Sequence, residues 1–103
     1  MQPPIPFDCR LQLASDTHVE IYWFQPNGFV RAVLGTQDGP QCAPLFRYRV
    51  LSGDSIELIG SDGIIDTWTN IRVESELLHA ESKGEPKAFR ITQEEAAERG
   101  PQQ

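Results

Sequence analysis

Turn-forming residues recur at short intervals along almost the whole chain, and their spacing is the feature that most constrains the fold. Segments rich in β-branched and aromatic residues are separated by short groups of Gly, Asn, Asp and Pro. Such spacing is typical of an all-β domain. We therefore predict a single small antiparallel meander of about seven or eight strands, forming an up-and-down barrel or half-barrel. The predicted strands are 8–14, 17–24, 29–35, 44–51, 55–60, 64–69, 71–80 and 87–92.

The two ends of the chain do not continue this pattern. The first seven residues contain three prolines, which lack the N–H group that a regular ladder needs, so they predict a lead-in arm. Residues 92–95 form a capping box and are followed by a Gly100-Pro101 stop, which predicts a short helical turn or a disordered tail. The 103 residues suffice for one domain, so we predict a β domain at 1–92 and a tail at 93–103.

The first hairpin is apolar on both faces. Pro26-Asn27-Gly28 favours a tight turn, and the resulting register places Phe24 opposite Val30 and Ile21 opposite Val33. One face then carries Tyr22, Phe24, Val30, Ala32 and Leu34, while the other carries Val19, Ile21, Trp23, Phe29 and Val33. Since neither face suits contact with water, barrel closure, a partner or a ligand must cover the second one. We predict that this second set forms a binding surface or lines a cavity.

The second hairpin is apolar on one face only. A three-residue loop at 51–53 or at 52–54 places Glu57 opposite Arg47 or Arg49 on the polar face. We expect a solvated ion pair there, worth under about 1 kcal/mol, and no binding site. The opposite face carries Phe46, Tyr48, Val50, Ile56 and Leu58. These aromatic residues, with the others of the chain, are expected to form most of the core.

Charge and composition exclude several classes of function. Fifteen acidic residues against nine basic ones give a net charge of −6, which disfavours nucleic acids and anionic membrane surfaces. No apolar run approaches the ~20 residues of a transmembrane helix, and the N-terminus lacks the regions of a signal peptide. These features predict a cytoplasmic protein.

No arrangement of residues indicates catalysis, a metal or a cofactor. The chain has two histidines, of which His79 alternates with Leu78 and Ala80 and is expected to face solvent. Cys9 is predicted to be a small buried residue, and whether it pairs with Cys42 stays open. An enzyme would require His18 or His79 to converge with a carboxylate or a cysteine in one cleft. We predict no catalytic residues, no metal ligands and no cofactor.

Four segments in a characteristic order occur between about residues 17 and 91: Trp23 to Gly28, Phe46 to Leu58, Leu77 to Ala80, and Phe89-Arg90. This order resembles small lipocalin-like domains of the calycin type. The resemblance implies an up-and-down barrel or half-barrel that holds an apolar ligand in its mouth. The chain is shorter than the usual lipocalin and lacks the opening Gly-x-Trp, so no ligand-binding residues can be transferred to it.

Two functions follow as expectations. The first is a non-catalytic interaction domain that self-associates as a homo-oligomer or binds a protein partner. The alternative is a carrier of a small apolar ligand inside a lipocalin-like barrel. A cavity of a few hundred Å³ would favour the carrier, because ligand pockets typically measure about 300–1,000 Å³.

Overall fold

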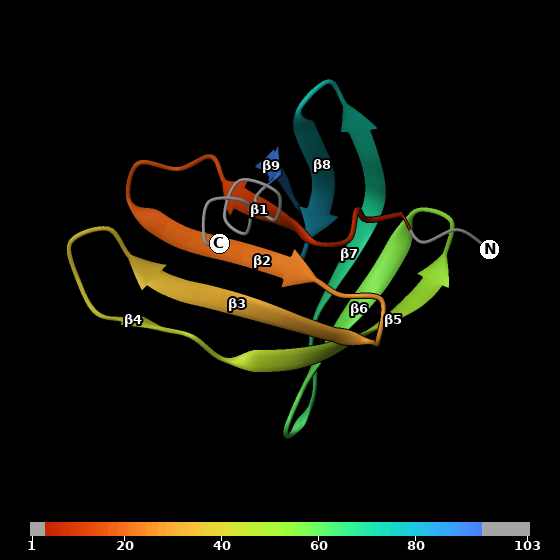
Figure 1. Ribbon diagram of the computed structural model, residues 1–103, viewed down its shortest axis with the longest axis horizontal. Coiled ribbons are helices and arrows are strands. Elements are labelled where there is room, and N and C mark those ends of the chain that lie inside the picture. The colour runs from red at the N-terminus through yellow and green to blue at the C-terminus, as the bar shows by residue number, and fades with distance from the viewer. Residues whose placement is uncertain (1–3, 94–103) are drawn as a thin grey trace, which may run out of the picture.

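The predicted succession of short strands and turns produces a closed barrel. The computed structural model describes residues 4–93, in which nine strands form one continuous antiparallel sheet. The strands are β1 (Cys9–Leu13), β2 (His18–Phe24), β3 (Phe29–Thr36), β4 (Gln41–Cys42), β5 (Leu45–Ser52), β6 (Ser55–Gly60), β7 (Gly63–Glu74), β8 (Leu77–Ser82) and β9 (Glu85–Gln93). Eight of them follow one another around the barrel, which closes where β9 pairs with β1 (Figure 1). The prediction of an all-β up-and-down meander is confirmed, and the structure selects the closed barrel.

The additional strand, β4, was not predicted. It pairs with the end of β3, where Gly35 lies opposite Gln41. A Cβ atom at Gly35 would lie 2.4 Å from the carbonyl oxygen of Pro40 and 2.8 Å from the Cα atom of Gln41. Only glycine therefore allows the two backbones to approach this closely. The helical turn or tail was predicted at 93–103, after a capping box that begins at Thr92. Thr92 and Gln93 belong to β9, and the rest of the predicted segment lies outside the described residues.

The register of the first hairpin is the predicted one. Phe24 pairs with Val30, Tyr22 with Ala32 and Ile21 with Val33. Because side chains alternate across a strand, the set that includes Tyr22 and Phe24 points into the barrel. The set that includes Ile21 lies on the outer wall.

The second hairpin differs from its prediction in two details. Its turn has two residues, because Ser52 pairs with Ser55 and a register shift lies between Val50 and Ser52. Glu57 pairs with Arg49, one of the two predicted partners, and their side chains form an ion pair. The pair is not fully solvated as expected, since Glu57 is buried while Arg49 stays exposed. The inward set of this hairpin is the predicted one.

The boundary between β7 and β8 was predicted wrongly. Residues 63–74 form one long strand with a register shift between Thr69 and Arg72, and the chain reverses at Ser75 and Glu76. Asn70 and Ser75 have positive φ angles of 52° and 57°. Such left-handed positions favour Gly or Asn, so a serine there gives little sequence signal for a turn. The predicted strand 71–80 therefore spans a reversal.

The middle of the barrel is filled by aromatic rings, as expected for the core. Phe24, Trp68 and Phe89 are fully buried. The ring of Trp68 stacks on Phe89 with centroids 4.9 Å apart and meets the edge of Tyr22 at 5.1 Å. These buried rings occupy the middle of the barrel.

One end of the barrel is closed by the N-terminal arm. Ile5 is buried in the core cluster and Phe7 packs against it. The backbone N–H of Asp8 donates to the carbonyl oxygen of Phe24, at the residue where β2 ends. The arm predicted from its prolines thus contributes to the core at this end. Within the described range, no helix is long and apolar enough to cross a membrane.

Candidate functional site

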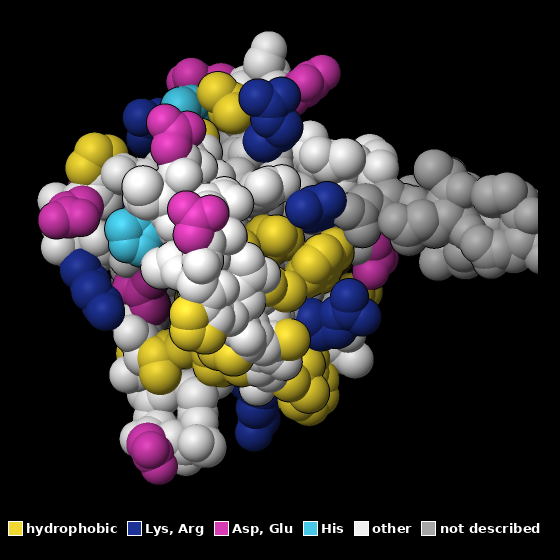
Figure 2. All heavy atoms as spheres, turned by 90° about the vertical axis from the view of Figure 1, so that its left-hand side faces the viewer, with side chains coloured by type: hydrophobic (Ala, Val, Ile, Leu, Met, Phe, Trp, Pro, Cys, Tyr) yellow, Lys and Arg dark blue, Asp and Glu magenta, His cyan; other side chains and the backbone are white. Residues whose placement is uncertain are grey.

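The opposite end of the barrel is hollow. A cavity of about 310 Å³ lies there, between the first residues of β2, β5 and β7 and the last residues of β3 and β6. The β8–β9 turn and the beginning of β9 complete its rim. Its lining residues are His18, Val19, Glu20, Tyr22, Leu34, Gly35, Phe46, Leu58, Ile65, Asp66, Lys83 and Lys87. Figure 2 shows the side on which the 14–17 and 37–40 loops lie, where hydrophobic side chains gather next to basic and acidic ones.

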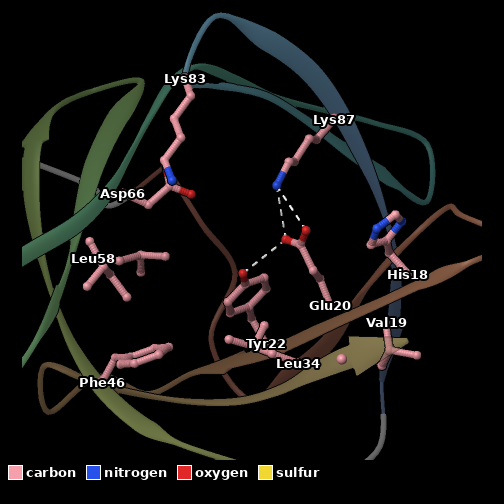
Figure 3. Close-up of a pocket in the computed structure, with 12 residues that line it drawn as sticks. His18, Val19, Glu20, Tyr22, Leu34, Phe46, Leu58, Asp66, Lys83 and Lys87 are labelled. Atoms are coloured by element: carbon pink, nitrogen blue, oxygen red, sulfur yellow. Dashed lines mark hydrogen bonds and ion pairs between the residues drawn. The ribbon is translucent and has the colours of Figure 1, made fainter. Parts of the chain in front are cut away.

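One wall of the cavity carries a half-buried ion pair. The Lys87 Nζ atom donates to both carboxylate oxygens of Glu20, at 3.1 and 3.0 Å. The Tyr22 hydroxyl donates to Glu20 Oε1 at 3.1 Å. Both charged side chains are less than a quarter exposed, so water screens this pair less than a surface pair. The pair reaches across β1 and joins β2 to β9 (Figure 3).

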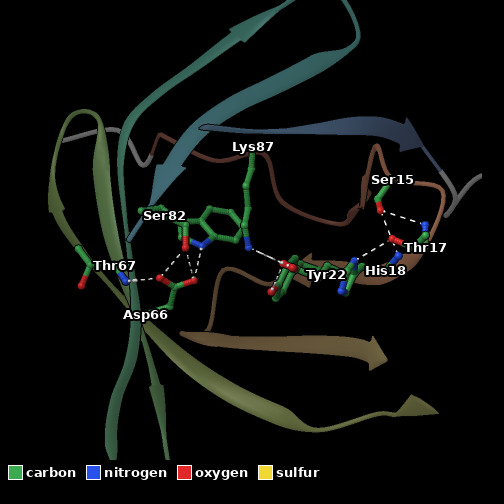
Figure 4. A network of polar contacts seen from close by, with 10 residues as sticks. Ser15, Thr17, His18, Tyr22, Asp66, Thr67, Ser82 and Lys87 are labelled. Carbon is green, nitrogen blue, oxygen red and sulfur yellow. Dashed lines mark hydrogen bonds and ion pairs between the residues drawn. The ribbon is translucent and has the colours of Figure 1, made fainter. Parts of the chain in front are cut away.

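A second polar cluster surrounds the carboxylate of Asp66. Ser82 Oγ lies 2.8 Å from both of its oxygens, and the indole Nε1–H of Trp68 donates to Oδ2 at 3.2 Å. The backbone N–H of Thr67 donates to Oδ1 at 2.8 Å. Asp66 therefore ties β7 to β8 at the floor of the cavity and satisfies the polar atom of the buried Trp68 (Figure 4).

The facing wall is apolar. Phe46 and Leu58 project into the cavity opposite Glu20 and Lys87 (Figure 3), and Leu34 lies beside Glu20, its register partner on β2. Leu58 is buried, whereas Leu34 and Phe46 are half-buried. Ile65 lies at the rim and is 39% exposed. The cavity is thus amphipathic, with charged and hydrogen-bonding groups on one side and aliphatic and aromatic groups on the other.

The two histidines do not converge on a catalytic arrangement. His18 lies at the rim, where its Nδ1 atom is 3.0 Å from Thr17 Oγ1. His79 lies on the face opposite the buried Leu78 and Ala80, as the alternation predicted, but it is half-buried, with Nε2 3.7 Å from a carboxylate oxygen of Glu74. Cys9 is buried, Cys42 is exposed, and no disulfide joins these two thiols. Among residues 4–93, no group of three or more His, Cys, Asp or Glu side chains is arranged to hold a metal ion.

The site residues predicted from the sequence lie on the outer wall of β2 and β3. Val19 and Ile21 are buried, with exposed fractions of 9% and 8%. Trp23 and Val33 are half-buried, and Phe29 is 37% exposed. Arg31 lies over the Trp23 ring at 5.1 Å from its centroid. Val19 alone of this set also belongs to the lining of the cavity.

The polar wall was missed at the level of sequence, although part of its signal was present. Glu20, Tyr22 and Phe24 stand at every second position of one strand, so their side chains point to the same side of it. Lys87 stands two residues before the buried Phe89 in the same way. Alternation was therefore a signal that both charges point inward, but the sequence analysis did not use it. That they meet could not be known without the closure of β9 on β1.

Comparison of the chain with protein-family models, with curated proteins and with solved structures finds no match. The class that the coordinates define is a closed, eight-stranded, up-and-down antiparallel β-barrel with one open, amphipathic end. This architecture is compatible with a lipocalin-like barrel.

The hydroxyl of Tyr22 makes the stability of the barrel sensitive to alkaline pH. Burial, followed by the nearby charge of Glu20, raises the pKa of Tyr22 far above its usual value of 10.0. At pH values below 10.0, the phenol is neutral in both the folded and the unfolded chain. Above it the unfolded chain loses the proton first, so the free energy of unfolding falls as pH rises, by about 1.4 kcal/mol per pH unit for this one group.

We expect the substitution Tyr22→Phe to reduce this alkaline loss of stability. At neutral pH the variant should lose about 1 kcal/mol with the hydrogen bond to Glu20. Urea unfolding across a series of pH values measures both effects. Tyr48→Phe is the matched comparison: burial also raises the pKa of Tyr48, whose hydroxyl donates to the backbone of Gln25, but substitution of this half-buried residue should reduce the alkaline loss less than Tyr22→Phe does. Equal alkaline slopes for wild type and Tyr22→Phe would contradict the assignment.

Proposed function

We propose that the barrel binds a small amphipathic molecule in the cavity at its open end. The observation that carries this proposal is the division of one cavity into a charged wall, with Glu20 and Lys87, and an apolar wall, with Phe46 and Leu58. A core filled only for stability gains little from an ion pair that is largely removed from water, because the desolvation of two charges offsets much of their attraction. A ligand that has both a polar and an apolar part matches both walls.

The size and position of the cavity support the same function. Eight-stranded barrels are just wide enough to be filled by side chains or to hold one small ligand. Here the rings of Trp68 and Phe89 fill the middle, and the open end retains about 310 Å³, near the lower limit of ligand pockets. The ligand therefore lies in the mouth and not along the axis. This is the carrier function expected of lipocalin-like domains, and membership of that group is part of the proposal.

The expected interaction domain has less support at the surface where the sequence placed it. Val19 and Ile21 leave little of their surface exposed, so the outer face of the first hairpin offers only part of the predicted patch. Ligand binding is therefore the function that we favour.

A titration of the ¹⁵N-labelled full chain tests the proposal. We expect octyl compounds with different head groups to move the indole N–H resonance of Trp68, because this N–H donates to Asp66, which lines the cavity. The resonance of Trp23, on the outer wall, should stay in place, and these are the only two tryptophans of the chain. No shift of Trp68 with any head group at millimolar concentration would overturn the proposal.

Filling the cavity provides a second test. We expect Leu34→Trp to abolish the binding, because Leu34 lines the cavity beside Glu20 and the larger ring occupies that space. Leu45→Trp makes the same change at a side chain that is 61% exposed and does not line the cavity, so it is the matched control. Unchanged binding by Leu34→Trp would place the ligand elsewhere.

A further inference from the structure

The hydrogen-bonding capacity that the cavity leaves unused consists mainly of donors. The carboxylate of Asp66 already accepts bonds from Ser82, Trp68 and Thr67. The carboxylate of Glu20 accepts from Lys87 and Tyr22. Both anions of the wall are therefore satisfied by the protein itself, and a further cation would have to displace one of these donors.

The two cations of the cavity are less fully used. An ammonium group has three N–H donors, and Lys87 directs its hydrogen bonds to Glu20 alone. Among the described residues, Lys83 makes no hydrogen bond and no ion pair, although it lines the same cavity (Figure 3). Lys83 and Lys87 are the only lysines of the chain. Every ammonium side chain of an acidic protein thus lies at this one opening.

The ion pair itself shows which group fits against Lys87. The carboxylate of Glu20 meets the ammonium with both oxygens, at 3.0 and 3.1 Å. Glu20 lies at the open end of the barrel and is 22% exposed, so its side chain can turn toward water when another anion takes its place. Glu20 then acts as an internal counter-ion that keeps Lys87 ordered and neutralised in the empty barrel.

We propose that the ligand is an amphipathic anion, whose head group binds Lys87 and Lys83 by displacing Glu20 and whose apolar part packs on Phe46 and Leu58. This inference rests on the proposed function and adds the sign of the charge on the ligand's head group. A charge-assisted hydrogen bond between an ammonium and a carboxylate or phosphate is about twice as strong as a neutral one. This difference favours an anionic ligand over a neutral ligand with the same apolar part.

The test compares octanoate, octyl phosphate, octanol and octylammonium on the full chain by isothermal titration calorimetry. We expect the affinity of at least one of the anions to be about tenfold or more above that of the alcohol and of the ammonium compound. Equal or tighter binding of octanol or octylammonium would overturn the anion while leaving the proposed function in place. Binding of none of the four would overturn both.

Variants of the two lysines test the head-group contacts. Lys83→Asn removes an exposed cation at a position whose φ of 54° suits asparagine, so the turn should persist. We expect this variant and Lys87→Gln to weaken octanoate binding about tenfold and to leave octanol binding unchanged. Arg90→Gln removes a positive charge from an exposed position of β9 outside the cavity and is the control. Equal octanoate binding by the lysine variants and the control would overturn the assignment.

The variant Glu20→Gln distinguishes two roles of Glu20: a counter-ion that the ligand displaces, and a residue that only supports the fold. Without its charged competitor, Lys87 should bind octanoate several-fold more tightly, while the amide oxygen introduced by this substitution can still accept the hydrogen bond from Tyr22. The double variant Glu20→Gln/Lys87→Gln leaves no unpaired charge in the wall and should bind octanoate more weakly than wild type. Weaker binding by Glu20→Gln alone would overturn the displacement.

Discussion

Replacement of Trp68 by alanine is expected to lower the free energy of unfolding by about 3–5 kcal/mol, the range observed for large aromatic residues in cores. Trp68 is fully buried, stacks on Phe89 at 4.9 Å and meets Tyr22 and Phe24 edge-on at 5.1 and 5.7 Å. The deletion therefore leaves a void between three rings that come from β2 and β9. Since domains of this kind have about 5–15 kcal/mol of stability in total, the variant should be partly unfolded at moderate temperature.

Urea unfolding followed by far-UV circular dichroism measures this loss without relying on the fluorescence of the deleted residue. The matched control is Trp23→Ala, which removes the same side chain from the outer wall, where Trp23 is half-buried beneath Arg31. We expect the control to lose less than half as much stability. Similar losses for the two variants would show that the inside and outside of the barrel are not assigned correctly.

Replacement of Asp66 by leucine is expected to lower the free energy of unfolding by about 2–4 kcal/mol, although leucine is the more hydrophobic residue. Leucine cannot accept the hydrogen bonds from Trp68 Nε1 and Ser82 Oγ. Both donors belong to buried residues, and each buried donor left without an acceptor costs about 1–3 kcal/mol. The variant should also loosen the cavity, because Asp66 connects β7 with β8 at its floor.

Asp66→Asn is the control for this second prediction. The amide has nearly the same shape and keeps one oxygen as an acceptor, so it should lose clearly less stability than leucine. Chemical denaturation gives the two free energies, and the indole resonance of Trp68 reports whether its hydrogen bond persists. A leucine variant as stable as wild type would show that the cluster around Asp66 does not contribute to stability.

The sequence was most informative where strand pairing is local. The turn at Pro26 to Gly28 determines the register of its hairpin, because a tight turn leaves its two strands one way to pair. The same logic failed at Ser75, where a serine with a positive φ angle reverses the chain without glycine or proline to indicate it. It also failed at Gln41 and Cys42, which form a strand only because Gly35 lets their backbone approach.

The candidate site was less accessible from the sequence, for a physical reason. Glu20 and Lys87 each stand two positions before a residue that proves to be buried, but they are 67 positions apart in the chain. Whether such charges meet depends on the closure of the barrel and on the stagger of strands between them, and neither has a local sequence signal. The sequence instead drew attention to Trp23 and its neighbours, whose apolar side chains are visible as a pattern along a single strand.

The sequence by itself determined the class of fold, which residues share each face of both long hairpins, and the aromatic residues of the core. These properties follow from periodicity and turn chemistry, which act over a few residues. Only the tertiary structure decided that the barrel closes, that Ile5 and Phe7 pack at one end, and that the other end retains a cavity with Glu20 and Lys87 facing Phe46 and Leu58. These properties depend on contacts between strands distant in the chain, where the packing of side chains in three dimensions decides which space is filled and which stays open.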